Sequence, residues 1–118
     1  MKITHIITDL DTGGAEIMLH KLLVSLCNDE ISSSVISLMG RGKITERIEA
    51  LGIKVETLDL RQGERPSWQA IKKLRQFMRA FNPDIVQGWM YHGNIAATVA
   101  VFLFDPMRRK VKLFWNVR

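Results

Sequence analysis

The residues best suited to bind a ligand follow the first predicted strand of the chain. Residues 9–16 read Asp-Leu-Asp-Thr-Gly-Gly-Ala-Glu, so that Gly13 and Gly14 stand at the start of a predicted helix. A glycine pair lets a ligand approach the backbone closely, and the amides and dipole of a helix N-terminus favour an anion. The expected occupant is a phosphate or diphosphate. The alternative is a tight turn that needs glycine for its backbone conformation, with Glu16 compensating the helix dipole.

A second group of candidate residues follows the fourth predicted strand. Tyr91, His92 and Asn94 lie within a segment, residues 87–94, that reads Gln-Gly-Trp-Met-Tyr-His-Gly-Asn. An aromatic ring, an imidazole that titrates near neutral pH and an amide suit a polar, hydroxylated ligand. No catalytic residue is assigned, and His92 is the candidate. The alternative is a polar loop followed by a helix that Asn94 caps, with His92 partly buried.

Two hydrophobic periodicities alternate along the chain and define the elements that must position these residues. Strands are predicted over 2–8, 34–38, 54–60, 84–89 and 112–117, and helices over 15–28, 44–51, 68–81 and 94–104. The pattern predicts an α/β fold, a Rossmann-like doubly wound parallel sheet of about five strands with helices on both faces. Ligands bind such sheets at the carboxyl ends of the strands, so the loops after strands one, three and four are the ones to examine.

Two of the helices have an apolar stripe that predicts a buried face. In the first helix the stripe consists of Ala15, Met18, Leu19, Leu22, Leu23 and Leu26. In the third it consists of Trp68, Ile71, Leu74, Met78 and Phe81. Gly52 stands where a C-terminal glycine ends the second helix.

Composition excludes several classes of protein. The chain has 118 residues, 47% hydrophobic and 25% charged, as expected of one globular domain. A single cysteine, Cys27, excludes a disulfide scaffold and a multi-cysteine metal site. No apolar run is long enough for a spanning helix, and acidic residues interrupt the N-terminal apolar stretch, so a cytoplasmic protein is expected. His5 and His20 are expected to be structural.

The net charge of +5 is concentrated in a few segments. Lys72, Lys73, Arg75 and Arg79 lie opposite the apolar stripe of the third helix. A cationic amphipathic helix of this kind can contact an anionic membrane surface, which would place the protein peripherally at the inner face of the membrane. The alternative is a solvated outer face. No nucleic-acid recognition motif or zinc spacing is present, so no nucleic-acid partner is expected.

The motifs together resemble the N-terminal domain of family-4 glycosyltransferases, which have the GT-B fold. The resemblance rests on Gly13-Gly14-Ala15-Glu16, on Pro83-Asp84-Ile85-Val86-Gln87, on residues 89–94 and on the final Phe-Trp-Asn-Val-Arg, and it covers the whole chain. It implies transfer of a sugar from a nucleotide-sugar donor to a glycan, lipid-linked or small-molecule acceptor, with retention and without a metal or other cofactor. It implies a role in cell-envelope or polysaccharide biosynthesis.

The resemblance also implies roles for individual residues and a division of the enzyme. Gly13 and Gly14 would approach the donor diphosphate, and Tyr91, His92 and Asn94 would line the acceptor side. A histidine that many members carry after strand five is absent here. Residues 1–118 would be a truncated N-terminal domain, inactive without the C-terminal donor-binding domain.

Two other functions remain open from the sequence. The first is a phospho-acceptor receiver domain, in which Asp9, Asp11 and Asp59 would hold Mg²⁺ beside a phosphorylated aspartate. Against it, a receiver needs a lysine near the end of strand five. The second is a non-catalytic nucleotide-binding module, which shares the fold but needs no partner domain.

Overall fold

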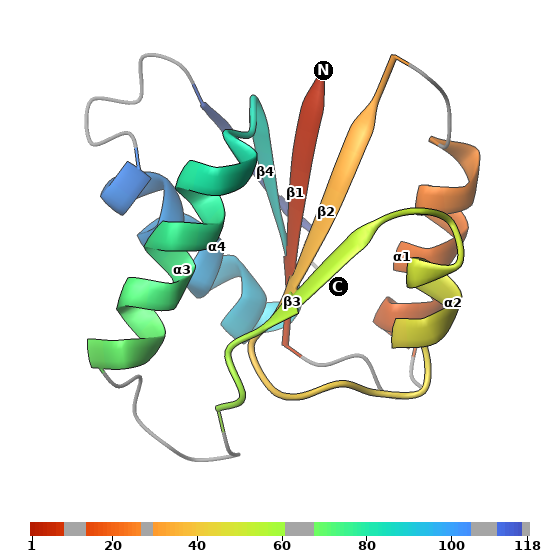
Figure 1. Cartoon of the computed structure of the whole chain (residues 1–118), viewed down its shortest axis with the longest axis horizontal. Coiled ribbons are helices and arrows are strands. Elements are labelled where there is room, and N and C mark those ends of the chain that lie inside the picture. Colours follow the sequence, from red (N-terminus) through yellow and green to blue (C-terminus); the bar gives the residue numbers. More distant parts are fainter. Residues whose placement is uncertain (9–13, 27–29, 61–67, 105–110, 117–118) are drawn as a thin grey trace.

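Strands and helices alternate along the chain in the computed structural model (Figure 1), which describes residues 1–8, 14–26, 30–60, 68–104 and 111–116. The strands are β1 (Lys2–Ile7), β2 (Ser32–Ser37), β3 (Lys54–Thr57), β4 (Ile85–Trp89) and β5 (Lys112–Asn116). The helices are α1 (Gly14–Ser25), α2 (Thr45–Glu49), α3 (Trp68–Phe81) and α4 (Met90–Phe104). Each predicted strand and helix is present, with ends that differ by up to a few residues.

The strands form one parallel sheet in the order β3-β2-β1-β4-β5. The first three strands run outward from β1 to one edge, and the chain then returns to the other side of β1 to add β4 and β5. Helices α1 and α2 cover one face of the sheet, and α3 and α4 cover the other (Figure 1). The predicted doubly wound, Rossmann-like α/β fold is therefore confirmed.

Alternating side chains of the strands build two cores. Ile6, Ile36 and Val86 lie in the core under α3 and α4, while Ile7 and Val35 lie in the core under α1 and α2. Successive strand residues point to opposite faces, so a strand covered by helices on both sides must be apolar at consecutive positions. Ile6 and Ile7 in β1 are both fully buried and meet that requirement.

Strand β3 is shorter than predicted because its extended run is interrupted. Leu58 and Leu60 still donate backbone hydrogen bonds to the carbonyls of Ser37 and Leu38. Between them Asp59 adopts a left-handed backbone with φ 54°. A residue in that conformation ends a regular strand, and neither hydrophobicity nor β-propensity reveals it.

Two residues of the predicted buried faces are in fact exposed. Trp68 is 74% exposed because, as the first residue of α3, it stands about 120° around the helix from buried Leu74. In α1, Leu19 and Leu23 are buried as predicted, but Met18 is 37% exposed and Glu16 is buried instead. Among the described residues, no helix is long and apolar enough to cross a membrane.

Gly52 ends helix α2 in the way the sequence predicts. Its φ is +82°, and its amide donates to the carbonyl of Glu49 in the last turn. A side chain at this φ is strained, although a Cβ there would meet no atom within 4 Å.

We expect Gly52→Ala to lower the free energy of unfolding by about 1 kcal/mol because alanine is strained in the left-handed region. Urea denaturation followed by circular dichroism measures the change. The control is Gly14→Ala, at an exposed helical position with open space around the Cβ, which should be neutral or stabilising. Equal effects of the two substitutions would contradict the strain argument.

Candidate functional site

The candidate site lies at the carboxyl ends of β1 and β4, where the strand order reverses. Ile7 pairs with Trp89 at the ends of these strands. From β1 the chain passes to α1 on one face, and from β4 it passes to α4 on the other face (Figure 1). Because the two helices leave in opposite directions, a crevice is expected between their N-termini, which is where doubly wound sheets bind ligands.

Gly14 is the first residue of α1, and the space beside it is open. Gly14 is exposed, and a Cβ built on it would meet no atom of the described residues within 4 Å. Its φ is not in the left-handed region, so the alternative of a turn that requires positive φ does not apply to Gly14. Gly13 lies outside the described residues, as do Asp9, Asp11, Cys27 and residues 61–67 of the loop predicted after the third strand. The room at Gly14 is compatible with an anion at the helix N-terminus.

Tyr91, His92 and Asn94 lie in the first turns of α4 and not in a loop. The prediction of a polar loop and an Asn94 cap was wrong, because α4 starts at Met90, directly after β4. The packing of Ala97, Ala100 and Val101 against the sheet extends the helix back through Gly93 despite the low helix propensity of glycine. The side chains of residues 90–94 are outside the described part of the structure, so their contact with an acceptor stays a prediction.

A hydrogen bond between two buried side chains fixes the end of β4 against β1. The Trp89 indole Nε1 donates to Nδ1 of His5 over 3.1 Å, and the rings are tilted by 52°. Residue 5 pairs with residue 87, so Trp89 is its diagonal neighbour on the same face. The sequence suggested a structural His5 but did not reveal its partner, which becomes visible only when β4 is placed beside β1.

Burial holds His5 in its neutral form. The side chain is fully buried, and desolvation lowers its pKa from 6.5 to about 4. Since Nδ1 accepts the indole proton, the imidazole proton must be on Nε2, which has no hydrogen-bond partner among the described residues. His5 is therefore unsuited to proton transfer near neutral pH and serves to position Trp89.

Two further polar groups lie beside this edge. Glu16, in the first turn of α1, is only 4% exposed although it carries a carboxylate. It lies in the first turn of the helix, near the positive end of the helix dipole. The Thr8 hydroxyl, one residue beyond β1, is buried without a hydrogen-bond partner in the described part of the chain. Sequence reasoning did not single out Thr8, because a lone threonine at a strand end carries no signal.

The strand order excludes the receiver arrangement. Receiver domains have the order 2-1-3-4-5, in which strand three lies next to strand one. Here β2 separates β3 from β1, so β3 and Asp59 after it are not on a strand adjacent to β1. The Asp59 carboxylate instead accepts a hydrogen bond from the Thr57 hydroxyl at 3.1 Å. Among the described residues no group of three or more His, Cys, Asp and Glu is placed to hold a metal ion.

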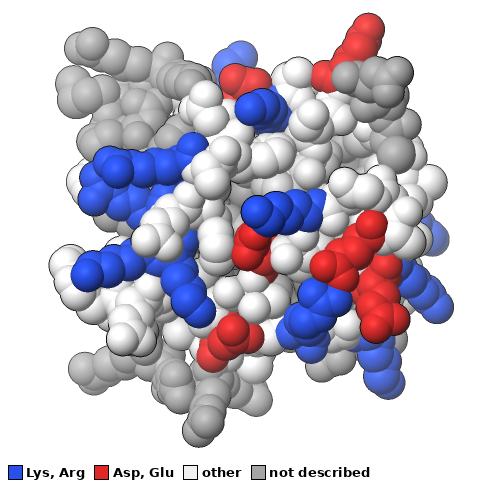
Figure 2. Space-filling view, viewed as in Figure 1, with Lys and Arg blue, Asp and Glu red and all other residues white. Residues whose placement is uncertain are grey.

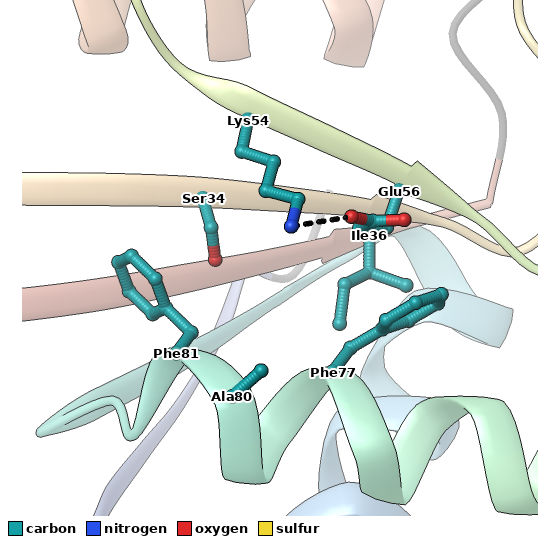
Figure 3. Close-up of a pocket in the computed structure, with 7 residues that line it drawn as sticks. All are labelled: Ser34, Ile36, Lys54, Glu56, Phe77, Ala80 and Phe81. Carbon is teal, nitrogen blue, oxygen red and sulfur yellow. Dashed lines mark ion pairs between the residues drawn. The ribbon is translucent and has the colours of Figure 1, made fainter.

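A small groove beside β2 and β3 is not part of this site. It has a volume of about 130 Å³ and lies between α3 and the strands β2 and β3 (Figure 3). A salt bridge of 3.1 Å joins Lys54 and Glu56 on its wall. The groove lies on the β2–β3 side of β1, whereas Trp89 is in β4 on the other side of β1.

Comparison with known proteins finds similar structures but no sequence family. No family model matches the chain, and no curated protein matches it. A protein assigned as a UDP-N-acetylglucosamine 2-epimerase from Listeria monocytogenes superposes with a TM-score of 0.57 and 20% identity, over 96% of this chain and 29% of that one. Another UDP-N-acetylglucosamine 2-epimerase gives 0.55 and 15%, over 98% of this chain and 32% of that one. The chain spans about a third of their length, and the likeness shows the fold.

We expect the buried neutral His5 to make the protein less stable in mild acid. Because its pKa falls from 6.5 to about 4 on folding, the unfolded chain takes up a proton that the folded chain refuses. This contribution is complete above pH 6.5 and is lost as the pH falls toward 4, with about 2 kcal/mol gone near pH 5. Urea denaturation at pH 7.5 and pH 5 measures it.

The control for this prediction is His5→Gln, which keeps a hydrogen-bond acceptor near Trp89 but does not titrate. The difference in unfolding free energy between the two proteins should change by about 2 kcal/mol between the two pH values, in favour of the variant at pH 5. Parallel loss of stability in both proteins would mean that His5 does not cause the acid sensitivity.

Proposed function

We propose that the chain forms one domain of an enzyme that acts on a nucleotide-sugar, and that it binds the diphosphate at the N-terminus of α1. The observation that carries the proposal is the open space at Gly14, located where the strand order reverses between β1 and β4. The amides of a first helical turn suit a diphosphate because they have no partner within the helix, can each donate a hydrogen bond, and lie at the positive end of the helix dipole.

The reaction that we propose is glycosyl transfer with retention and without a metal. The sugar leaves the nucleotide diphosphate and bonds to an acceptor hydroxyl, which loses its proton. The diphosphate gains negative charge as the sugar departs, and donors fixed at a helix N-terminus stabilise that charge. On this proposal Gly13 and Gly14 lie beside the diphosphate, and Tyr91, His92 and Asn94 lie on the acceptor side at the start of α4.

The proposal also includes a second domain. Transfer requires donor and acceptor to be held together in a fixed orientation, which a single open edge of a sheet does not provide. The similar epimerases are about three times as long as the part of them that this chain covers. We therefore propose that residues 1–118 act as the N-terminal part of a two-domain enzyme of GT-B type and bind ligand without turnover on their own.

A non-catalytic nucleotide-binding module is the other function consistent with this edge. It would use the same helix N-terminus and need no partner domain. The two functions differ in what a longer parent protein does with a nucleotide-sugar. Transfer of sugar to an acceptor favours the first, and binding without turnover by the parent favours the second.

The proposed diphosphate site is tested by measuring, with calorimetry, the binding of UDP and of inorganic pyrophosphate to the 118-residue chain. We expect both to bind and to compete, and uridine to bind far more weakly. Gly14→Asp places a carboxylate at the helix N-terminus and should weaken both ligands at least about tenfold by charge repulsion. Aspartate is well tolerated near a helix N-terminus, so the fold should survive.

The matched control is Ser32→Asp, which adds the same charge at the exposed first residue of β2, at the amino ends of the strands and away from the proposed site. It should leave pyrophosphate binding within about twofold, since the Debye length at ordinary salt is only about 10 Å. Equal losses in the two variants, or pyrophosphate binding that Gly14→Asp does not change, would show that the diphosphate does not bind at α1.

A further inference from the structure

The outward sides of α3 and α4 form one surface on the molecule. The two helices pack against each other on the same face of the sheet. Leu74 and Met78 of α3 share a buried core with Ala97 and Val101 of α4. The residues opposite these buried ones therefore point away from the sheet together.

Helix α3 presents an exposed cationic stripe that includes a tryptophan. Trp68, Lys72, Arg75 and Arg79 recur at intervals of four, three and four residues and so share one side of the helix. All four are exposed, as is Lys73 on the adjoining side. Residues 68–81 contain no Asp or Glu. Among the described residues the salt bridges join Arg41 to Glu49 and Lys54 to Glu56, so no described carboxylate neutralises this stripe.

The charged side chains on the face of the molecule shown in Figure 2 agree with a cationic stripe on α3. In Figure 2 blue Lys and Arg side chains gather at the left, where Figure 1 places α3, while the red carboxylates lie toward the top, the middle and the right, where further blue side chains also lie.

Helix α4 presents an exposed apolar stripe beside it. Ile95, Val99 and Phe102 recur at intervals of four and three residues, and Phe102 is 67% exposed. Residues 90–104 contain no charged side chain. The outer side of a surface helix is normally polar, so an apolar stripe on that side marks a contact surface.

The two stripes border each other. Phe77, Ala80 and Phe81 of α3 line the groove toward β2 and β3 (Figure 3). Successive residues of a helix are about 100° apart around its axis. On the side of Leu74 that faces away from the groove, the surface of α3 leads past Ile71 to Arg75 and Trp68. The cationic stripe consequently lies on the flank of α3 that adjoins α4.

We propose that this α3–α4 face docks on an anionic lipid bilayer, with Trp68 and the α4 stripe entering the interface and the cations contacting the headgroups. The α3–α4 face consists of Trp68, Lys72, Arg75 and Arg79 with Ile95, Val99 and Phe102. Amphipathic side chains of these kinds bind membrane interfaces through combined apolar burial and attraction to anionic lipid. The inference does not depend on the proposed nucleotide-sugar chemistry.

Charge complementarity favours a bilayer over a second copy of the chain. A symmetric dimer through this face would bring the α3 cations of both protomers near each other, and no carboxylate of the described residues forms a salt bridge with them. An anionic surface relieves that repulsion and at the same time accepts the apolar stripe of α4, which a purely polar anionic partner would leave exposed.

The test is co-sedimentation of the 118-residue chain with two kinds of vesicle, phosphatidylcholine alone and phosphatidylcholine with roughly one third phosphatidylglycerol. We expect binding to the anionic vesicles and its decline as salt is raised. Trp68 fluorescence should shift to the blue on binding, and Trp68→Phe should remove that shift while binding remains.

The paired variant Lys72→Gln/Arg79→Gln should weaken binding roughly 25-fold, about fivefold for each cation. The matched control is Lys21→Gln/Arg47→Gln, which removes the same charge from exposed positions of α1 and α2 on the other face. It should change binding no more than about twofold. Val99→Ser/Phe102→Ser should weaken binding about tenfold and leave its salt dependence in place.

Three results would overturn the proposal. One is equal binding to both kinds of vesicle, and another is equal loss in the α3 variant and its control. The third is absence of vesicle binding together with a dimer, seen by sedimentation velocity, that Val99→Ser/Phe102→Ser dissociates. Circular dichroism of each variant separates these results from a failure to fold.

Discussion

The parallel pairing of β1 with both β2 and β4 is the constraint on which the rest of the structure depends. β1 is hydrogen-bonded on both edges and covered by helices on both faces. The connections that follow β1 and β4 are right-handed and lead to neighbouring strands on opposite sides. They therefore place α1 and α4 on opposite faces, and the two helices must diverge at the carboxyl ends of β1 and β4. The open edge at Gly14 is a consequence of this topology.

The same burial explains why a histidine is tolerated in the central strand. An imidazole taken out of water is stable there only when it is neutral and at least partly hydrogen-bonded. Trp89 supplies one bond, and the low pKa of about 4 keeps the ring uncharged. The cost of this arrangement is a sensitivity to acid that an aliphatic side chain would not have. Its benefit is a fixed position for Trp89, the residue immediately before α4.

The sequence was a good guide to elements and a poorer guide to their relations. Periodicity located every strand and helix because buried faces impose it, and the glycine at position 52 was predictable because few other residues adopt its φ. Strand order was not predictable from periodicity. The observed order is incompatible with a receiver domain, because β2 lies between β1 and the strand that precedes Asp59. The start of α4 was missed because packing of Ala97 and Val101 outweighs the local preference of a segment containing Gly93. Trp68 was misplaced because apolar character was taken as burial.

The exposure of Trp68, which the sequence pattern placed on a buried face, is itself informative. A tryptophan or phenylalanine left in water forgoes the free energy that burial would provide, so several such side chains exposed beside cations mark a contact surface. Helix α4 connects such a contact surface to the candidate site. Its first residue, Met90, follows the carboxyl end of β4, and its outward apolar stripe lies on the α3–α4 face. If that face rests on a bilayer, the start of α4 is held at a fixed height above the lipid. An acceptor anchored in the same bilayer would then reach the proposed acceptor side by lateral diffusion, in two dimensions instead of three, and lipid-linked acceptors would be favoured over free ones without any added contact to the sugar.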